Sequence, residues 1–171
     1  LVGSEMCIRD SYNRGYLNER LPQEIKRSTR YRHPLSLILS DIDHFKKVND
    51  RFGHLAGDHV LQEFVQCLIE SIRDQIDWTA RYGGEEFVVV LPETDFSGAM
   101  LLAERLREAC SQRIINTREK QISITASFGV TGFTAEMPGG DISVETLLQQ
   151  SDTCLYQAKN QGRNRVVGQP L

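Results

Sequence analysis

Several absences narrow the class of this protein. No apolar run approaches the roughly 18 residues that a membrane-spanning helix needs. The start of the chain lacks the basic and apolar segments of a signal peptide. The four cysteines show neither a CxxC motif nor zinc-like pairing. We therefore expect reduced, mostly buried thiols and a cytoplasmic domain, whether or not the full-length protein is anchored to a membrane.

The charge is nearly balanced, with a formal net value of −3 at pH 7. This small acidic excess argues against binding along nucleic acid, which needs a basic face. A nucleotide substrate is compatible with it, because a local cation cluster or a metal ion can hold phosphates. The 171 residues, 40% of them apolar, suit one domain with one core.

Hydrophobic periodicity and turn residues predict an α/β chain of the α+β type. The expected helices cover residues 16–30 (with Pro22 as a possible break), 45–52, 58–72, 96–115 and 144–160. The expected strands cover residues 35–40, 78–82, 87–91, 122–130 and 165–167. The second and third of these strands flank a Gly-Gly turn, which is typical of an antiparallel hairpin. We therefore expect a central, mostly antiparallel five-stranded sheet flanked by helices.

Two carboxylates end the first expected strand. Asp41 and Asp43 project to one face, and Ile42 between them points to the other. Neighbouring carboxylates repel unless a cation lies between them, and oxygen ligands suit Mg²⁺. An ordinary helix cap explains the pattern equally well, and both can hold, with Asp41 as the ligand and Asp43 as the cap.

The hairpin turn carries two glycines and two glutamates. Gly83 and Gly84 allow a ligand to approach the backbone closely, and Glu85 and Glu86 follow at once. Because successive strand residues point to opposite faces, only one glutamate is expected to share a ligand fully with Asp41. Taken alone, an ordinary hairpin with two surface glutamates explains this pattern better.

Two further pairs suggest a nucleotide site. Lys159 and Arg163 bracket the end of the last helix, where they complement the helix dipole or clamp a triphosphate. Asn49 and Asp58 lie near a helix–helix corner, where they cap helices or read a base. A carboxylate can accept both N1–H and N2–H₂ of guanine, a donor pair that adenine lacks.

Taken together, these motifs resemble the GGDEF family of diguanylate cyclases. Two long segments match: SDIDHFKKVND at residues 40–50 and RYGGEEF at residues 81–87. Shorter matches lie at residues 52–54, 57–58, 127–130, 152–159 and 162–164. The resemblance covers about residues 12–168 in order and spacing. It implies a fold similar to the palm of class III nucleotidyl cyclases.

The resemblance also implies roles for individual residues. Asp41 and Glu85 would bind Mg²⁺, or Mn²⁺ in its place, with help from the Ile42 carbonyl; Glu86 matches the second acidic position of the motif. The substrate-binding residues implied are Asn49 and Asp58 for guanine, Gly83 and Gly84 along the nucleotide, and Lys46, Lys159 and Arg163 for the phosphates. Asp41, Glu85 and Glu86 would form the catalytic group.

The reaction implied is the condensation of two GTP into cyclic di-GMP and two pyrophosphates, in bacterial second-messenger signalling. One half-site holds one GTP, so catalysis requires a homodimer. A domain that binds GTP or cyclic di-GMP as a sensor without turnover is the alternative, although the acidic and basic residues above are all present. A cyclase that uses ATP is a third reading, against which Asp58 argues.

Two departures from the family pattern matter. The inhibitory product site Arg-x-x-Asp would place an arginine where Asp74 stands, with Arg73 one residue away and Asp77 in place. We expect product inhibition to be weak or absent, although Arg105 could match a secondary contact. Residues 1–11 also lack the family's usual run, so we expect a non-native or disordered leader before a domain at residues 12–171. A sensory or dimerising region would then precede the domain in the full-length protein.

Overall fold

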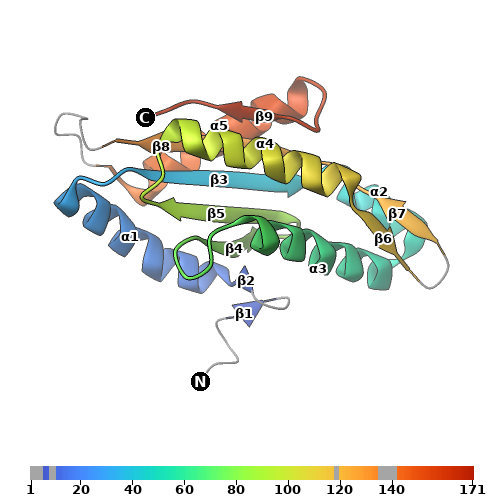
Figure 1. The fold of residues 1–171 in the computed structure, drawn as a ribbon. Coiled ribbons are helices and arrows are strands. Elements are labelled where there is room, and N and C mark those ends of the chain that lie inside the picture. Colours follow the sequence, from blue (N-terminus) through green and yellow to red (C-terminus); the bar gives the residue numbers. More distant parts are fainter. Residues whose placement is uncertain (1–5, 8–10, 118–119, 135–141) are drawn as a thin grey trace.

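The computed structural model describes residues 6–7, 11–117, 120–134 and 142–171 (Figure 1). Its helices are α1 (Arg14–Tyr31), α2 (Phe45–Phe52), α3 (His54–Ser71), α4 (Phe96–Gln112) and α5 (Val144–Asn160). Its strands are β1 (Met6–Cys7), β2 (Ser11–Tyr12), β3 (Leu35–Ile42), β4 (Trp78–Gly83), β5 (Glu86–Pro92), β6 (Ile114–Asn116), β7 (Gln121–Ser123), β8 (Ala126–Phe133) and β9 (Val166–Gly168). The order of elements confirms the predicted α+β class.

The main sheet has the strand order β1-β2-β4-β5-β3-β8-β9 within the described residues. Strand β3 is an interior strand that pairs antiparallel with β5 and β8, while β9 runs parallel to β8. The five predicted strands are all present, but the predicted count is wrong. Two-residue strands β1 and β2 extend the edge beside β4 and make the sheet seven-stranded.

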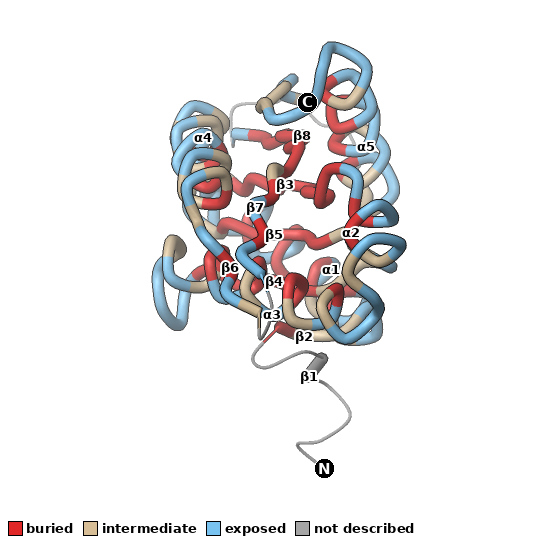
Figure 2. The backbone as a smooth tube through the Cα atoms, turned by 90° about the vertical axis from the view of Figure 1, so that its right-hand side faces the viewer, coloured by how far each residue is buried: buried red, intermediate tan, exposed pale blue. Residues whose placement is uncertain are grey.

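Helices cover both faces of this sheet. One apolar cluster joins α2, α3 and α4 to one face, and a second joins α1 and α5 to the other. Figure 2 shows the strands stacked between α4 on one side and α5 on the other, with the buried residues between them. Every residue of β3 is buried. Because side chains alternate along a strand, Leu37 and Leu39 face the α1/α5 side, and Ile38 faces the other side.

Helix α4 is shorter than expected, and the strand predicted at residues 122–130 is divided. Helix α4 ends at Gln112, and the next residues form strand β6, in which Ile115 pairs with Ile122 across the separate β6–β7 hairpin. Both isoleucines are buried, with 1% and 3% of their surfaces exposed. Apolar residues at the end of a helical pattern thus belong to a strand, which periodicity alone could not show.

Two predicted helix boundaries also change. Pro22 does not interrupt α1, which is capped by the Asn13 side chain accepting from the Tyr16 N–H at 2.9 Å. Pro22 is exposed, so the backbone bond that it removes lies on the solvent side of the helix. Helix α3 begins at His54 rather than Asp58, since Gly53, at φ 84°, turns the chain directly from α2 into α3.

Within the described residues, no helix combines the length and apolarity needed to cross a bilayer. Of the expected leader, Met6–Cys7 and Ser11 lie in strands, and the remaining residues fall outside the part of the chain that the structure describes. The non-native leader and the domain boundary at residue 12 stay predictions.

Candidate active site

The predicted site residues come from segments that meet at one end of the sheet. Strand β3 ends beside α2, and β5 begins at that same end, after the turn from β4 (Figure 1). In the antiparallel register, Asp41 of β3 lies opposite Glu86 of β5 on one side and Ser127 of β8 on the other. Directly opposite residues project to the same face of a sheet, so Asp41 and Glu86 share the face covered by α5.

Asp41 forms the centre of this site. Its Oδ2 accepts from Nζ of Lys159, near the end of α5, at 2.7 Å. The carboxylate side chain is 11% exposed and the lysine side chain 29% exposed. The pKa of Asp41 is raised from its usual 3.8 to about 6: burial is the largest cause, the hydrogen bond and charge of Lys159 oppose it, and the charges of Glu85 and Glu86 add to it. Two cluster members predicted from different motifs are thus in contact.

The β4–β5 turn brings the two glutamates to Asp41. The N–H of Ile42 donates to the carbonyl of Glu85 at 3.4 Å, which ties the turn to the end of β3. Both glutamates are half-buried, and both act on the Asp41 charge, Glu85 more strongly than Glu86. Glu85 precedes β5, so strict strand alternation does not apply to it, and the expectation that only one glutamate shares a ligand fully with Asp41 stays a prediction.

The glycines of the turn differ in their surroundings. A Cβ at residue 83 would lie 3.2 Å from Oε2 of Glu86, whereas a Cβ at residue 84 would meet nothing within 4 Å. Arg81 holds the turn in place, since its Nε and Nη2 donate to the Gly84 carbonyl at 2.9 and 2.6 Å. The backbone at Gly84 is therefore both open to a ligand and fixed in position.

The donor set fits a hard cation that arrives with a substrate. Asp41, Glu85 and Glu86 offer only oxygen ligands, and their mutual repulsion favours a cation among them. Across the described ranges, no group of three or more acidic, histidine or cysteine side chains is arranged to hold an ion alone. Mg²⁺ commonly uses one or two carboxylates and completes its coordination with phosphate oxygens and water, so this arrangement suits it.

The proposed base-reading pair lies at the α2–α3 corner. Gly57 packs against the Asn49 side chain so closely that a Cβ there would collide with Asn49 Oδ1. Asp58, the next residue, is exposed in α3. The capping interpretation is wrong for both residues, because Gly53 is the cap of each helix and no side chain caps α3. Both side chains thus have no capping role.

Asp43 has a different environment from the one expected. His44, not Asp43, occupies the N-cap position of α2, and no side chain caps that helix. The Asp43 carboxylate instead accepts from the hydroxyls of Thr125 and Ser127, each at 2.7 Å, and from the N–H of Asn164 at 3.0 Å. Its partners are distant in sequence, so the pattern around residue 43 could not reveal them.

Two predicted phosphate ligands are exposed. Lys46 lies in the first turn of α2, and Arg163 follows α5 with φ 62°. Neither forms an ion pair with another described residue. Of the predicted residues, the structure thus places Lys159 in contact with Asp41, and Glu85 and Glu86 near enough for their charges to act on it. Lys46 and Arg163 have no ion-pair partner within the described chain.

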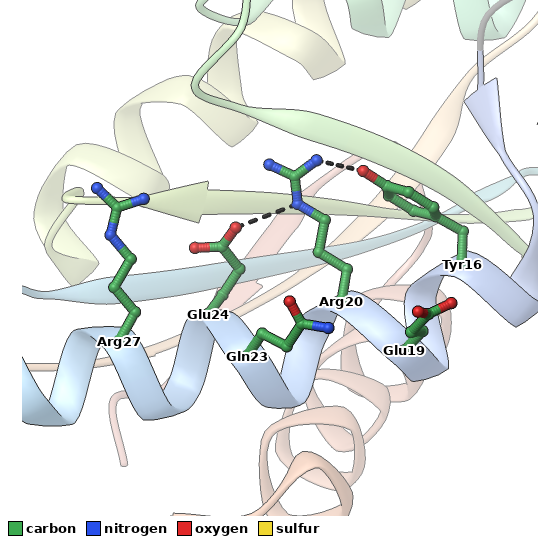
Figure 3. Close-up of a pocket in the computed structure, with 6 residues that line it drawn as sticks. All are labelled: Tyr16, Glu19, Arg20, Gln23, Glu24 and Arg27. Carbon is green, nitrogen blue, oxygen red and sulfur yellow. Dashed lines mark hydrogen bonds and ion pairs between the residues drawn. The ribbon is translucent and has the colours of Figure 1, made fainter.

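A separate hollow runs along α1 (Figure 3). Its lining comes entirely from that helix, and its polar groups bind one another: Nε of Arg20 donates to Glu24 at 3.1 Å, and the same guanidinium donates to the Tyr16 hydroxyl. This pairing is typical of a charged helix surface. None of the predicted site residues belongs to it.

Sequence reasoning missed two residues that shape the site. Arg81 was recognised only as part of a motif, although an arginine just before a Gly-Gly turn could signal a contact with the turn carbonyls. Asp43 was interpreted as a cap. Its burial, with 6% of its surface exposed, is the signal that would have distinguished it, and burial is a property of the folded chain.

Comparison with known families agrees with this geometry. Residues 10–165 match the family model described as diguanylate cyclase, GGDEF domain. The response regulator PleD of Caulobacter vibrioides is 44% identical over 171 residues, covering 96% of this chain and 36% of PleD. Diguanylate cyclase DgcP of Pseudomonas aeruginosa is 44% identical over 154 residues, covering 90% of this chain and 22% of DgcP. The chain thus spans about a third or less of these relatives.

Solved structures show the same fold. The GGDEF domain of DgcB from Caulobacter crescentus, in complex with c-di-GMP, superposes with a TM-score of 0.87 at 27% identity, covering 96% of this chain and 92% of that one. The active GGEEF domain of a diguanylate cyclase from Vibrio cholerae has a TM-score of 0.81 at 35% identity, covering 91% and 96%. With the same sheet, the same hairpin and a family match over most of its length, this chain belongs to the GGDEF domain family of diguanylate cyclases.

Proposed function

We propose that this domain is an active diguanylate cyclase, which condenses two GTP molecules into cyclic di-GMP and two pyrophosphates. The observation that carries the proposal is the contact of 2.7 Å between Lys159 and Asp41. It brings a candidate phosphate ligand into contact with a candidate metal ligand, near the two glutamates of the hairpin. Both ends of a metal–triphosphate complex would therefore find partners at the same place.

The phosphate end of the site would work through complementary charges. Asp41 and Glu85, with the Ile42 carbonyl, would hold a divalent cation, Mg²⁺ or Mn²⁺. When bound, the cation supplies positive charge to the α-phosphate and to the leaving pyrophosphate. Lys159 would bind the outer phosphates as a point charge and Arg163 as a planar fork, with Lys46 contributing from α2.

The base end would select guanine. Asp58 is exposed at the α2–α3 corner, where its carboxylate can accept N1–H and N2–H₂ of guanine together. The Asn49 amide beside Gly57 would complement the remaining polar edge of the base. Adenine would leave these groups unpaired, and unpaired polar groups in a binding site cost affinity strongly. Gly84 lets the nucleotide lie against the turn between the two ends.

The reaction needs two copies of the domain. The 3′-oxygen of each GTP attacks the α-phosphorus of the other, and the bond from that phosphorus to the bridging oxygen of pyrophosphate breaks. Glu85 would accept the 3′-hydroxyl proton, and Glu86 would complete the acidic group. Because each copy holds one GTP, two domains must face each other. The greater length of the relatives agrees with an additional sensory or dimerising region in the full protein.

The test is turnover of GTP with Mg²⁺, followed by chromatography of cyclic di-GMP, for the wild type, Asp41→Asn and Glu85→Gln. Both variants should bind GTP weakly or normally but lose product formation by a factor of about 100 or more, as expected when transition-state charge stabilisation is removed. Glu93→Gln, an exposed carboxamide change in a loop beside Arg27 and His33, is the matched control and should retain activity. Binding of GTP by the wild type without any product would contradict the proposal and identify a sensor.

A further inference from the structure

Asp43 carries a buried carboxylate whose oxygens are committed to hydrogen bonds. Oδ1 accepts from Ser127, and Oδ2 accepts from both Thr125 and the backbone N–H of Asn164. Its own N–H donates to the Thr125 carbonyl at 2.9 Å. No lysine, arginine or histidine pairs with Asp43 among the residues that the structure describes. Such a charge is tolerated in the interior only when its acceptor capacity is satisfied in this way.

One of these donors belongs to the loop that follows α5. Three consecutive residues there have positive φ: Gly162 at 118°, Arg163 at 62° and Asn164 at 46°. Non-glycine residues rarely adopt this conformation, so the surrounding contacts must hold them in it. The N–H of Arg163 donates to the Ala158 carbonyl at 3.0 Å, which accounts for the start of the turn.

The bond to Asp43 fixes the other end of this turn. The N–H of Asn164 belongs to the peptide unit that directly follows Arg163. Fixing this N–H therefore fixes the backbone at Arg163 and the direction in which its side chain projects. Arg107 also contacts the loop, but it reaches the Asn164 side chain at a longer distance of 3.3 Å. The Asp43–Asn164 bond therefore links the end of β3, which carries Asp41, to the loop that carries Arg163.

We propose that Asp43 is a positioning residue that holds the 161–165 loop so that Arg163 can bind the outer phosphates of the nucleotide. The effect on phosphate binding rests on the proposed function, since phosphate binding by Arg163 is part of that proposal. The other part, that Asp43 holds the loop, depends only on the hydrogen bonds of Asp43. The function of Asp43 would then be expressed in substrate affinity, through Arg163, and not through contact with substrate.

Wild-type hydrogen exchange tests whether Asp43 holds the loop, without any nucleotide. Asn164 is exposed and lies outside every helix and strand, so its amide would exchange rapidly if it were free. The Asp43 bond predicts that this amide is protected at least about tenfold more than the amide of Gly162, measured by NMR. Equal, fast exchange of the two amides would overturn the proposal, and this result does not depend on whether any variant folds.

Variants test the link to Arg163. Asp43→Ala removes both acceptor oxygens and should raise the KM for GTP about tenfold. This is the effect expected when Arg163 loses one hydrogen bond to the charged phosphates. Asp43→Asn should restore most of the affinity, because the amide oxygen can serve Asn164 while the Ser127 hydroxyl rotates to accept from the amide NH₂. Ser127→Ala removes a donor from Oδ1 alone and should leave the KM nearly unchanged.

A double-mutant cycle decides whether Asp43 acts through Arg163. In an Arg163→Ala background, Asp43→Ala should raise the KM less than twofold further, because the group that it positions is gone. A full tenfold increase in both backgrounds would overturn the proposal and indicate a general structural role. Absence of turnover in the wild type would instead contradict the proposed function, while the exchange experiment would still decide the position of the loop.

Discussion

The ammonium of Lys159 lies 2.7 Å from the carboxylate of Asp41, joining the end of α5 to the end of β3. In the absence of nucleotide, the lysine neutralises part of a charge that burial disfavours. A divalent cation and a triphosphate would offer each partner a stronger counter-charge: the cation for Asp41 and the phosphate for Lys159. The pair therefore ties the end of α5 to the end of β3, and under the proposed function substrate binding would exchange one ion pair for two.

Removal of the lysine charge should weaken both the fold and substrate binding. Lys159→Met preserves the aliphatic chain but leaves Asp41 without its hydrogen bond and counter-charge, so the melting temperature should fall at pH 8. The KM for GTP should rise by about tenfold or more, since a charge-assisted phosphate contact is lost. Lys26→Met, on the exposed side of α1, is the control. An unchanged KM would show that Lys159 serves the fold alone.

The pKa of Asp41 predicts how stability depends on pH. Burial raises this pKa from its usual 3.8 to about 6, so the folded chain binds the proton more tightly than the unfolded chain does. The contribution of this group to stability is fully present below about pH 4, decreases as pH rises, and is lost above about pH 6.

Asp41→Asn should consequently melt at a higher temperature than the wild type at pH 8 in EDTA, and this advantage should vanish near pH 4. Thermal unfolding across that range measures it, with Asp152→Asn, an exposed change in α5, as the reference. A lower melting temperature for Asp41→Asn at pH 8 would mean that the Lys159 pair outweighs the cost of burial.

The same carboxylate must be ionised to bind a cation. Protons and Mg²⁺ therefore compete for Asp41, and the concentration of Mg²⁺ that gives half-maximal activity should rise as pH falls through about 6. Rates measured at several Mg²⁺ concentrations between pH 5.5 and 8.5 would show this. If saturating Mg²⁺ failed to restore the rate at the acidic end, another group would control the profile.

Helix and strand bounds near this site could be predicted from the sequence better than the contacts between residues far apart in the chain. Helix α5 has the predicted bounds because Ser143 caps its start, accepting from the Thr146 N–H, and Gly162 follows its end. The β6–β7 hairpin was missed because Ile114 and Ile115 continue a helical apolar pattern. The hydrogen bond between Asp43 and Asn164 was missed for a different reason: the two residues are 121 positions apart, and a local pattern carries no information on such contacts.

Product inhibition through the family's Arg-x-x-Asp site should be absent. Arg73 donates to Asp77 through Nε, Nη2 and its backbone N–H at 3.0, 2.7 and 2.9 Å, so this carboxylate is already fully engaged. The same guanidinium also binds the Pro92 carbonyl and the Thr94 hydroxyl. Even Asp74→Arg, which restores the spacing, should therefore not create a site, because Asp77 stays paired to Arg73.

Calorimetry with cyclic di-GMP, with the active site saturated by a non-reactive GTP analogue, tests this prediction. The wild type and Asp74→Arg should show no tight binding, whereas the double variant Arg73→Ala with Asp74→Arg should gain it. Submicromolar binding to the wild type under these conditions would show that another arginine replaces the missing one. Arg105 is then the first candidate, and its Nη2 already donates to the Ser71 carbonyl at 3.2 Å.

The close packing of Gly57 against Asn49 should make residue 57 a determinant of guanine binding. Alanine is a better helix former than glycine, so Gly57→Ala would be expected to stabilise an isolated helix by up to about 1 kcal/mol. Here its methyl group would displace the Asn49 side chain, because the two cannot occupy the same space. The KM for GTP should rise severalfold while the secondary structure, measured by circular dichroism, is preserved.

Gly98→Ala in α4 is the matched control for this change. Its Cβ would lie 3.1 Å from the Asp95 and Thr94 side chains, which border the surface and can adjust. It should leave the KM unchanged. If Gly57→Ala also left the KM unchanged, Asn49 would tolerate displacement, and the guanine contact would have to come from Asp58 alone. Asp58→Ala in the same assay would then separate the two, since it should abolish the preference for GTP over ATP only if that contact is decisive.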